Sequence, residues 1–231
     1  MKKIFWSLIV SLLFASAGFA QVKKSRAVSG GATVPIKSIP QKTDSDTKSA
    51  GEKYTNAELK FEITFPKPWL IADSEFTRKI NEQGLDLALK APDDLSKVNK
   101  VQINRALDRV SVLVTAYRPT FTTEESALIR VSLENLSSVP AVRDAVDYFD
   151  LMRSQFKAMN LPPDFTYSET QAEQLGRKQF AYLDTTSKAG KKRLYATVRN
   201  GYAILFTLSY NSGGDLQTMR QILSEGNFSL K

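Results

Sequence analysis

The stretch Arg193–Tyr210, with the sequence RLYATVRNGYAILFTLSY, contains an Asn-Gly pair between two runs of aromatic, aliphatic and β-branched residues. Asn200 and Gly201 are residue types that accept positive φ at both central positions of a type I′ turn, which joins two antiparallel strands tightly. Such a turn fixes the register, because residues at equal distances from it face each other across the hairpin. The stretch therefore predicts a β-hairpin in which Arg199 is opposite Tyr202.

The predicted register divides the hairpin side chains between two faces, and both faces are largely apolar. One face carries Thr197 with Ile204 and Tyr195 with Phe206, and the other carries Val198 with Ala203, Ala196 with Leu205 and Leu194 with Thr207. A sheet with two apolar faces needs cover on both sides, which helices commonly provide. We therefore expect an α+β fold, in which an antiparallel β-sheet is sandwiched between helices above and below it.

The residues around the hairpin extend the sheet and close the chain. Phe180–Thr186 predicts another strand, joined through a short turn at residues 188–190, so that three strands form an antiparallel meander. Asp215 is expected to cap a final helix. This helix ends at Gly226, after which Phe228 can pack back against the domain. Its expected buried stripe consists of Leu216, Met219, Ile222 and Leu223.

Hydrophobic periodicity predicts further elements upstream. Leu59–Phe65 alternates apolar and polar residues with a period of two, which is typical of a half-buried strand. Val142–Met159 repeats apolar residues every three or four positions and predicts the clearest helix of the chain. Ala127–Leu133 favours a strand, with a helix starting near Thr123 as the alternative. The other expected segments are extended chain at 69–71, strands at 85–89 and 110–117, and a weakly amphipathic helix at 94–107.

The first twenty residues have the order of a secretory signal peptide. Two lysines come first, residues 4–14 form an almost unbroken apolar run, and residues 15–20 are rich in small side chains. Gly18 and Ala20 favour cleavage after Ala20, and Ala17 offers a second cut. The alternative is an uncleaved membrane anchor, although the apolar run is shorter than the roughly 20 residues that span a bilayer. We expect an exported bacterial protein, in the periplasm or outside the cell.

The distribution of charge separates a tail from a domain. Of the net charge of +8, residues 1–20 contribute two, residues 21–53 four and residues 54–231 two. Residues 21–53 also lack aromatic residues, so they cannot bury enough surface to become ordered. We predict a flexible basic tail at 21–53, either a solvated spacer or a peripheral contact to membrane lipid or cell wall. A single globular domain follows at 54–231, with too little excess charge for a nucleic-acid partner.

The chain has no cysteine and no histidine, which narrows its chemistry. Without cysteine there is no disulfide and no lipid attachment at the cleavage site, so stability must come from an apolar core. Without histidine, the usual zinc, copper and haem ligands and the histidine-dependent nucleophilic triads are missing. A hydrolase would need an unusual lysine base. We therefore expect no enzymatic activity, no catalytic residue, no cofactor and no metal.

Three stretches of the chain resemble the PsbP-like proteins, a family named for an extrinsic subunit of photosystem II and widespread as secreted bacterial domains. They are the strand Leu59–Phe65 followed by Pro66 and Trp69, the turn Leu175, Gly176 and Arg177 before the meander, and the closing helix with Ile222, Leu223 and then Phe228. The resemblance covers most of residues 54–231 and implies an antiparallel sheet between helices. The stretch at residues 93–140 is longer than in the compact members of the family. The family includes protein-docking subunits and proposed small-molecule binders, and it implies no catalytic residues.

Two charged clusters are candidates for binding. Asp144, Asp147 and Asp150 lie three apart on the predicted helix and could bind a hard cation or act as acids and bases. Arg143 and Arg153 are at pairing distance from them, which favours an ordinary solvated face. A basic cluster at a hairpin tip could contact phosphate, lipid headgroups or an acidic partner, or simply keep the tip solvated. It consists of Lys188, Lys191, Lys192 and Arg193.

An aromatic set on the meander is the candidate ligand surface, provided that no helix covers it. The set consists of Tyr182, Tyr195, Tyr202, Phe206 and Tyr210. Core packing is the favoured role of these side chains, because aromatic neighbours across strands commonly fill a sheet–helix interface. The sequence therefore favours an exported, non-enzymatic accessory or protein-interaction domain. The alternative is a binder of a small apolar or lipid-like ligand between the sheet and a helix.

Overall fold

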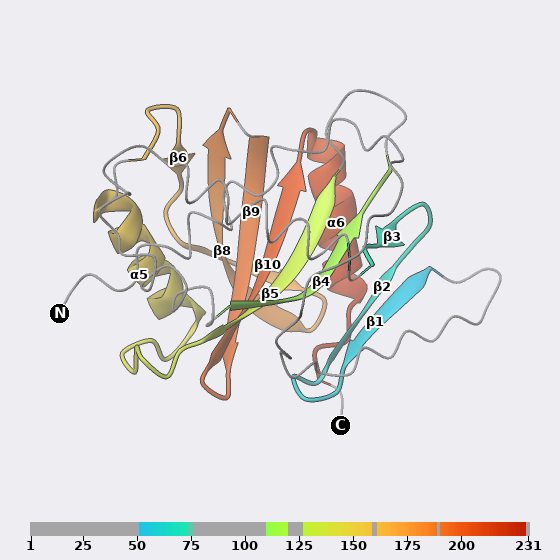
Figure 1. The fold of residues 1–231 in the computed structure, drawn as a ribbon, viewed down its shortest axis with the longest axis horizontal. Coiled ribbons are helices and arrows are strands. Elements are labelled where there is room, and N and C mark those ends of the chain that lie inside the picture. Colours follow the sequence, from blue (N-terminus) through green and yellow to red (C-terminus); the bar gives the residue numbers. More distant parts are fainter. Residues whose placement is uncertain are drawn as a thin grey trace, which may run out of the picture.

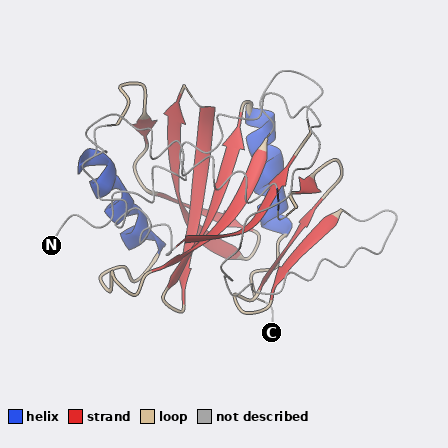
Figure 2. Cartoon of the chain, viewed as in Figure 1, coloured by secondary structure: helices blue, strands red, loops and turns tan. Residues whose placement is uncertain are grey.

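The computed structural model describes residues 51–73, 75, 110–119, 127–158, 161–188 and 190–229. These residues form a large antiparallel sheet, a separate two-stranded hairpin and two helices (Figure 1, Figure 2). In spatial order the large sheet contains β3 (Leu70–Ile71), β4 (Val110–Tyr117), β5 (Leu128–Asn135), β10 (Tyr202–Tyr210), β9 (Gly190–Arg199), β8 (Lys178–Ser187) and β6 (Thr166–Tyr167). A further strand, β7 (Gln171–Leu175), also pairs with β8.

The hairpin β9–β10 lies at the centre of this sheet and has the predicted register. Asn200 and Gly201 have φ values of 52° and 77°, so both central residues of the turn adopt the left-handed conformation that a type I′ turn requires. Arg199 is opposite Tyr202, and the pairing continues to Lys191 opposite Tyr210. The outer strands then attach to this hairpin, β8 to β9 and β5 to β10, and both pairs are antiparallel.

One face of the sheet packs against α6 (Gly213–Glu225) and the hairpin formed by β1 (Glu52–Asn56) and β2 (Phe61–Phe65). An aromatic cluster fills the centre of this core. The ring of Phe228 lies 6.2, 5.2 and 5.6 Å, between centroids, from the rings of Phe61, Phe180 and Phe206. Phe228 thus packs back as expected, just after α6 ends at Gly226.

The opposite face packs against α5 (Ala145–Ala158), which lies over β8 and β9. Phe149, Met152 and Phe156 of α5 are buried against the leucines and alanines of these strands. In Figure 1, α5 and the β1–β2 hairpin lie at opposite ends of the view. The antiparallel sheet is confirmed, and each face has one described helix. Complete helical cover of both faces is not shown, since a β-hairpin shares the α6 face.

Three details differ from the sequence expectations. The domain boundary at Tyr54 falls inside β1, because Glu52 already pairs with Phe65. The predicted strand Leu59–Phe65 begins at Phe61, since the residues before it form the turn between β1 and β2. The cap of α6 is the side chain of Ser212, which accepts a hydrogen bond from the backbone N–H of Asp215. Asp215 instead completes the capping box by accepting from the Ser212 N–H.

Several expectations fall on parts of the chain outside the described residues. These are the signal peptide at 1–20, the tail at 21–50, the strand at 85–89, the helix at 94–107 and the alternative helix near Thr123. The strands at 110–117 and 127–133 are confirmed as β4 and β5, and the helix of 142–159 is confirmed as α5. Of the helices that the structure describes, neither is long and apolar enough to cross a membrane.

Candidate ligand-binding site on the α5 face

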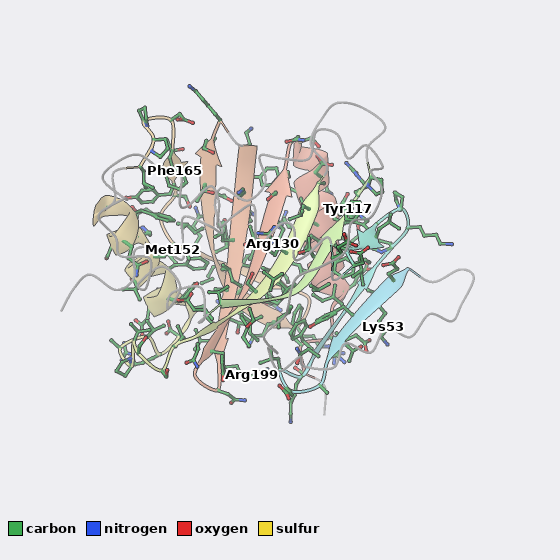
Figure 3. All side chains as sticks on the ribbon, viewed as in Figure 1. Lys53, Tyr117, Arg130, Met152, Phe165 and Arg199 are labelled. Atoms are coloured by element: carbon green, nitrogen blue, oxygen red, sulfur yellow. The ribbon has the colours of Figure 1, made fainter. Side chains whose placement is uncertain are left out.

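The face of the sheet that packs against α5 changes character from one half to the other. Over β8 and β9 it is mainly apolar and contacts α5, with Thr185 and Lys192 as its buried polar residues. Over β4, β5 and β10, besides Glu134, it carries four buried polar side chains with atoms that lack hydrogen-bond partners among the described residues. They are Thr115, Arg130, Ser132 and Thr207, which we call the polar patch. Their exposed fractions are only 1, 5, 1 and 3%. Arg130 lies over the middle of the sheet, away from Met152 of α5 (Figure 3).

Strand alternation puts these four side chains on one face. Ile129 and Val131 of β5 belong to the core on the α6 face, so Arg130 and Ser132 point to the α5 face. Pairing then aligns the neighbours, because Arg130 is opposite Thr115 of β4 and opposite Thr207 of β10. The patch is therefore a row of three polar residues across adjacent strands, with Ser132 one step along β5.

An irregularity in β4 determines which residue faces Arg130. The β4–β5 register shifts between Val112 and Val114, so that Val112 is opposite Ser132 while Val114 is opposite Val131. Without this shift, Val114 would be opposite Arg130. A bulge inserts one residue and reverses which side chains point to which face. The bulge thus places the hydroxyl of Thr115 beside Arg130.

The polar patch has unsatisfied hydrogen-bonding groups. Within the part of the chain that the structure describes, no hydrogen-bond partner is present for the Arg130 Nε–H or for the hydroxyls of Thr115, Ser132 and Thr207. A buried polar group without a partner costs about 1–3 kcal/mol, so such groups are uncommon in native proteins. Four such groups at neighbouring positions make the patch a candidate site for hydrogen-bonding atoms of another molecule.

Arg130 is also charged. Burial lowers the pKa of its guanidinium to about 10, so the group remains a cation at neutral pH. The next carboxylate along the same face of β5 is Glu134, four residues away, which corresponds to about 13 Å along a strand. The Tyr148 hydroxyl of α5 donates to Glu134 at 2.7 Å. Burial first, and the nearby Glu134 second, raise the pKa of Tyr148 well above its ordinary value, which keeps this hydroxyl protonated.

The predicted basic cluster is divided by the sheet. Lys188 and Lys191 are exposed at the β8–β9 turn, whereas Lys192 is 3% exposed and points to the α5 face. Arg193 points to the opposite face, where its guanidinium bonds both oxygens of Asp184 at 2.8 Å. The four residues therefore do not form one surface.

On the α6 face, Arg193 belongs to a network of ion pairs and hydrogen bonds. Its guanidinium lies 4.2 Å from the centre of the Tyr182 ring, and Glu173 accepts a hydrogen bond from the Tyr195 hydroxyl at 2.5 Å. Burial, together with this bond to Glu173, raises the pKa of Tyr195. Arg220 of α6 also pairs with Glu173. These groups pair with one another as in a structural network, although the Arg220 Nε–H has no acceptor among the described residues.

The three aspartates that the sequence offered as a cation site are instead bound to groups of α5 and its flanks. Asp144 accepts hydrogen bonds from two backbone N–H groups in the first turn of α5, while Asp147 and Asp150 pair with Arg143 and Arg153. These side chains form the charged face that the sequence favoured. Among the described residues, no group of three acidic side chains could hold a metal ion.

The aromatic set is divided between core and partly buried positions. Tyr195 and Phe206 are completely buried in the α6-face core, and Tyr182, Tyr202 and Tyr210 are half-buried. The α6 helix covers the centre of the candidate ligand surface, so the surface is filled there. The polar patch lies on the other face and was not singled out from the sequence. The sequence offers one signal for it, which is an arginine between the apolar residues Ile129 and Val131 of a predicted strand.

Comparisons with known proteins bear on the fold. No family model matches the chain, and no curated protein matches it. The solution structure of cyanobacterial PsbP (CyanoP) from Synechocystis sp. PCC 6803 is similar, with 12% identity over 87% of this chain and 97% of that chain and a TM-score of 0.44. A crystal structure from Bacteroides thetaiotaomicron has 11% identity over 77% of this chain and 48% of that chain, with a TM-score of 0.39. The first of these similarities agrees with the resemblance to PsbP-like proteins noted in the sequence, and both concern the fold alone.

Proposed function

We propose that this chain is an exported, non-enzymatic binding protein whose small ligand lies on the polar patch. The observation that carries the proposal is the set of four buried polar groups without partners on three adjacent strands. A ligand with hydrogen-bonding atoms would satisfy these groups and recover the free energy that their burial costs. Binding rather than catalysis fits this composition, because the patch offers hydrogen bonds and charge but no histidine or cysteine.

The polar patch differs from the other buried polar groups of the described structure. Two other buried polar side chains have clear partners: Asn56 accepts from the Leu59 N–H at 2.9 Å, and Asp215 pairs with Arg118. The few other buried atoms without partners lie on Arg153, Gln155 and Arg220, and both arginines form ion pairs through their other nitrogens. The polar patch is thus the largest group of unsatisfied atoms in the described structure.

This proposal modifies the lipid-like ligand considered from the sequence. The aromatic set that would line an apolar site is largely core, whereas the polar patch favours a ligand with at least one polar end. A protein-docking role would be supported by a continuous exposed apolar patch. Among the described residues, the exposed large hydrophobic side chains are Leu70 on β3 and Val146 on α5. These two residues lie on different elements and do not form a continuous patch, so we favour a small ligand over a protein partner.

Native mass spectrometry of the protein purified from the cells that make it tests the proposal. We expect a small molecule that stays bound in the gas phase and is released on unfolding. The double variant Thr115→Val, Thr207→Val removes two hydroxyls with little change of volume and should lower the occupancy. Thr64→Val, at an exposed position of β2, is the matched control and should retain the ligand. Equal occupancy in both variants, or a protein partner in place of a small molecule, would overturn the proposal.

A further inference from the structure

We propose that the ligand of the polar patch is an organic acid, and that its carboxylate or phosphate group pairs with the guanidinium of Arg130. This inference rests on the proposed function and specifies its ligand class. The shared chemistry is an anionic oxygen group attached to an organic body, and the two kinds of acid are separated by the experiment below.

Arg130 differs from the other described arginines in its partners. Arginines that are less buried are neutralised by acidic side chains: Arg118 by Asp215, Arg153 by Asp150 and Glu169, Arg193 by Asp184, and Arg220 by Glu173. Arg199 donates to the backbone carbonyls of Leu59 and Phe228. Arg130 is only 5% exposed, yet it has no ion-pair partner within the described residues. A buried charge is stable only when it is paired and hydrogen-bonded.

The polar neighbours of Arg130 in the patch are hydroxyl groups. Thr115 and Thr207 flank Arg130 across the two strands, and Ser132 follows it on β5. Hydroxyls can donate hydrogen bonds to an anion but cannot neutralise the guanidinium. Glu134, the nearest carboxylate along the same face of β5, already accepts from Tyr148. The patch therefore provides one fixed positive charge and three additional donors.

The guanidinium group determines which anions fit. Its planar set of N–H groups matches two oxygens of a carboxylate or a phosphate at once, which a single ammonium cannot do. A ligand oxygen group bound in this way could also accept from the Thr115 and Thr207 hydroxyls on either side. The same donors would not distinguish a neutral alcohol from water.

The residues around the patch indicate that the acid has an apolar part. Leu128 lies two residues from Arg130 on the same face of β5, Leu194 is opposite Thr207, and Leu205 is opposite Ser132. All three leucines are at most 3% exposed. Leu194 and Leu205 belong to the core beneath α5, so the guanidinium lies beside apolar side chains. Such surroundings suit the organic part of an acid better than a hydrated inorganic anion.

Thermal unfolding of ligand-free protein with three eight-carbon probes tests the inference. The probes are octanoate, octyl phosphate and the uncharged 1-octanol. We expect at least one of the acids to raise the unfolding temperature and octanol to have no effect, and the better acid identifies the headgroup. Arg130→Met should weaken the binding of that acid at least tenfold. Arg177→Met, at an exposed turn, is the matched control and should bind like the wild type.

The outcomes separate the two proposals. Equal effects of octanol and the acids, no effect of either acid, or unchanged acid binding by Arg130→Met would overturn the acidic ligand. A neutral ligand that depends on Thr115 and Thr207 would leave the proposed function in place. Arg130→Gln keeps a polar side chain without the charge and gives the same test if the methionine variant does not fold. Acid binding that survives in Arg130→Gln would also contradict the inference.

Discussion

Replacing Arg130 by methionine should stabilise the ligand-free protein, although it removes the group that we expect to bind the ligand. Burial lowers the pKa of Arg130 to about 10. At 1.36 kcal/mol per tenfold change in acidity, this places the cost of the buried charge at roughly 3 kcal/mol. Methionine keeps an unbranched apolar stem of similar length and carries no charge, so most of that cost should disappear. We expect the free energy of unfolding to rise by about 1–3 kcal/mol.

Urea unfolding of wild type and Arg130→Met, after both have been refolded from denaturant to remove bound molecules, measures this difference. A rise of 1–3 kcal/mol corresponds to an increase of roughly 2–12 °C in the melting temperature of a domain of this size. Arg177→Met should change the stability by less than about 0.5 kcal/mol, since that side chain is exposed. A loss of 1 kcal/mol or more in Arg130→Met would show that Arg130 makes a stabilising ion pair, and it would refute the reasoning.

Two further predictions concern the fold that supports the patch. Tyr148→Phe leaves the buried carboxylate of Glu134 without its hydroxyl donor and should lower the free energy of unfolding by about 1–3 kcal/mol at neutral pH. The pKa of Tyr148 is raised in the folded state, so its stabilisation is complete below pH 10 and declines as the pH rises above 10. The deficit of Tyr148→Phe in urea unfolding should therefore shrink above pH 10, and a constant deficit would contradict this. Gly176→Ala would place a Cβ 2.2 Å from the Ser224 carbonyl oxygen, whereas Gly201→Ala meets no atom within 4 Å. Both residues have positive φ, so Gly201→Ala should cost about 1 kcal/mol and Gly176→Ala clearly more, and equal melting temperatures would contradict the contact.

The elements predicted most accurately from the sequence are those set by local chemistry. Asn200 and Gly201 determine the turn, and the turn determines every pair of β9 and β10. The return of Phe228 after Gly226 follows from the end of α6. Less was predictable where local signals compete: Ser212 and Asp215 are both good capping residues, and only the structure shows which of them is the cap.

The polar patch could not be predicted, because it depends on pairing between distant parts of the chain. Alternation in β5 places Arg130 and Ser132 on the side opposite Ile129 and Val131, which is also the pattern of a strand with one solvated face. Their polar neighbours, Thr115 and Thr207, depend on β5 lying between β4 and β10. The neighbour of Arg130 on β4 further depends on a bulge, which no periodicity in the sequence indicates.

The most direct test of the account is the NMR signal of the Arg130 Nε–Hε group in ¹⁵N-labelled protein. This group has no hydrogen-bond partner within the described residues, so its chemical shifts report directly on a new acceptor. Arg130→Lys, which lacks the signal, provides the assignment. We predict that the Arg130 signal moves on addition of octanoate or octyl phosphate, and that 1-octanol leaves it in place. An Arg130 signal that stays unchanged at saturating concentrations of both acids would contradict the central claim.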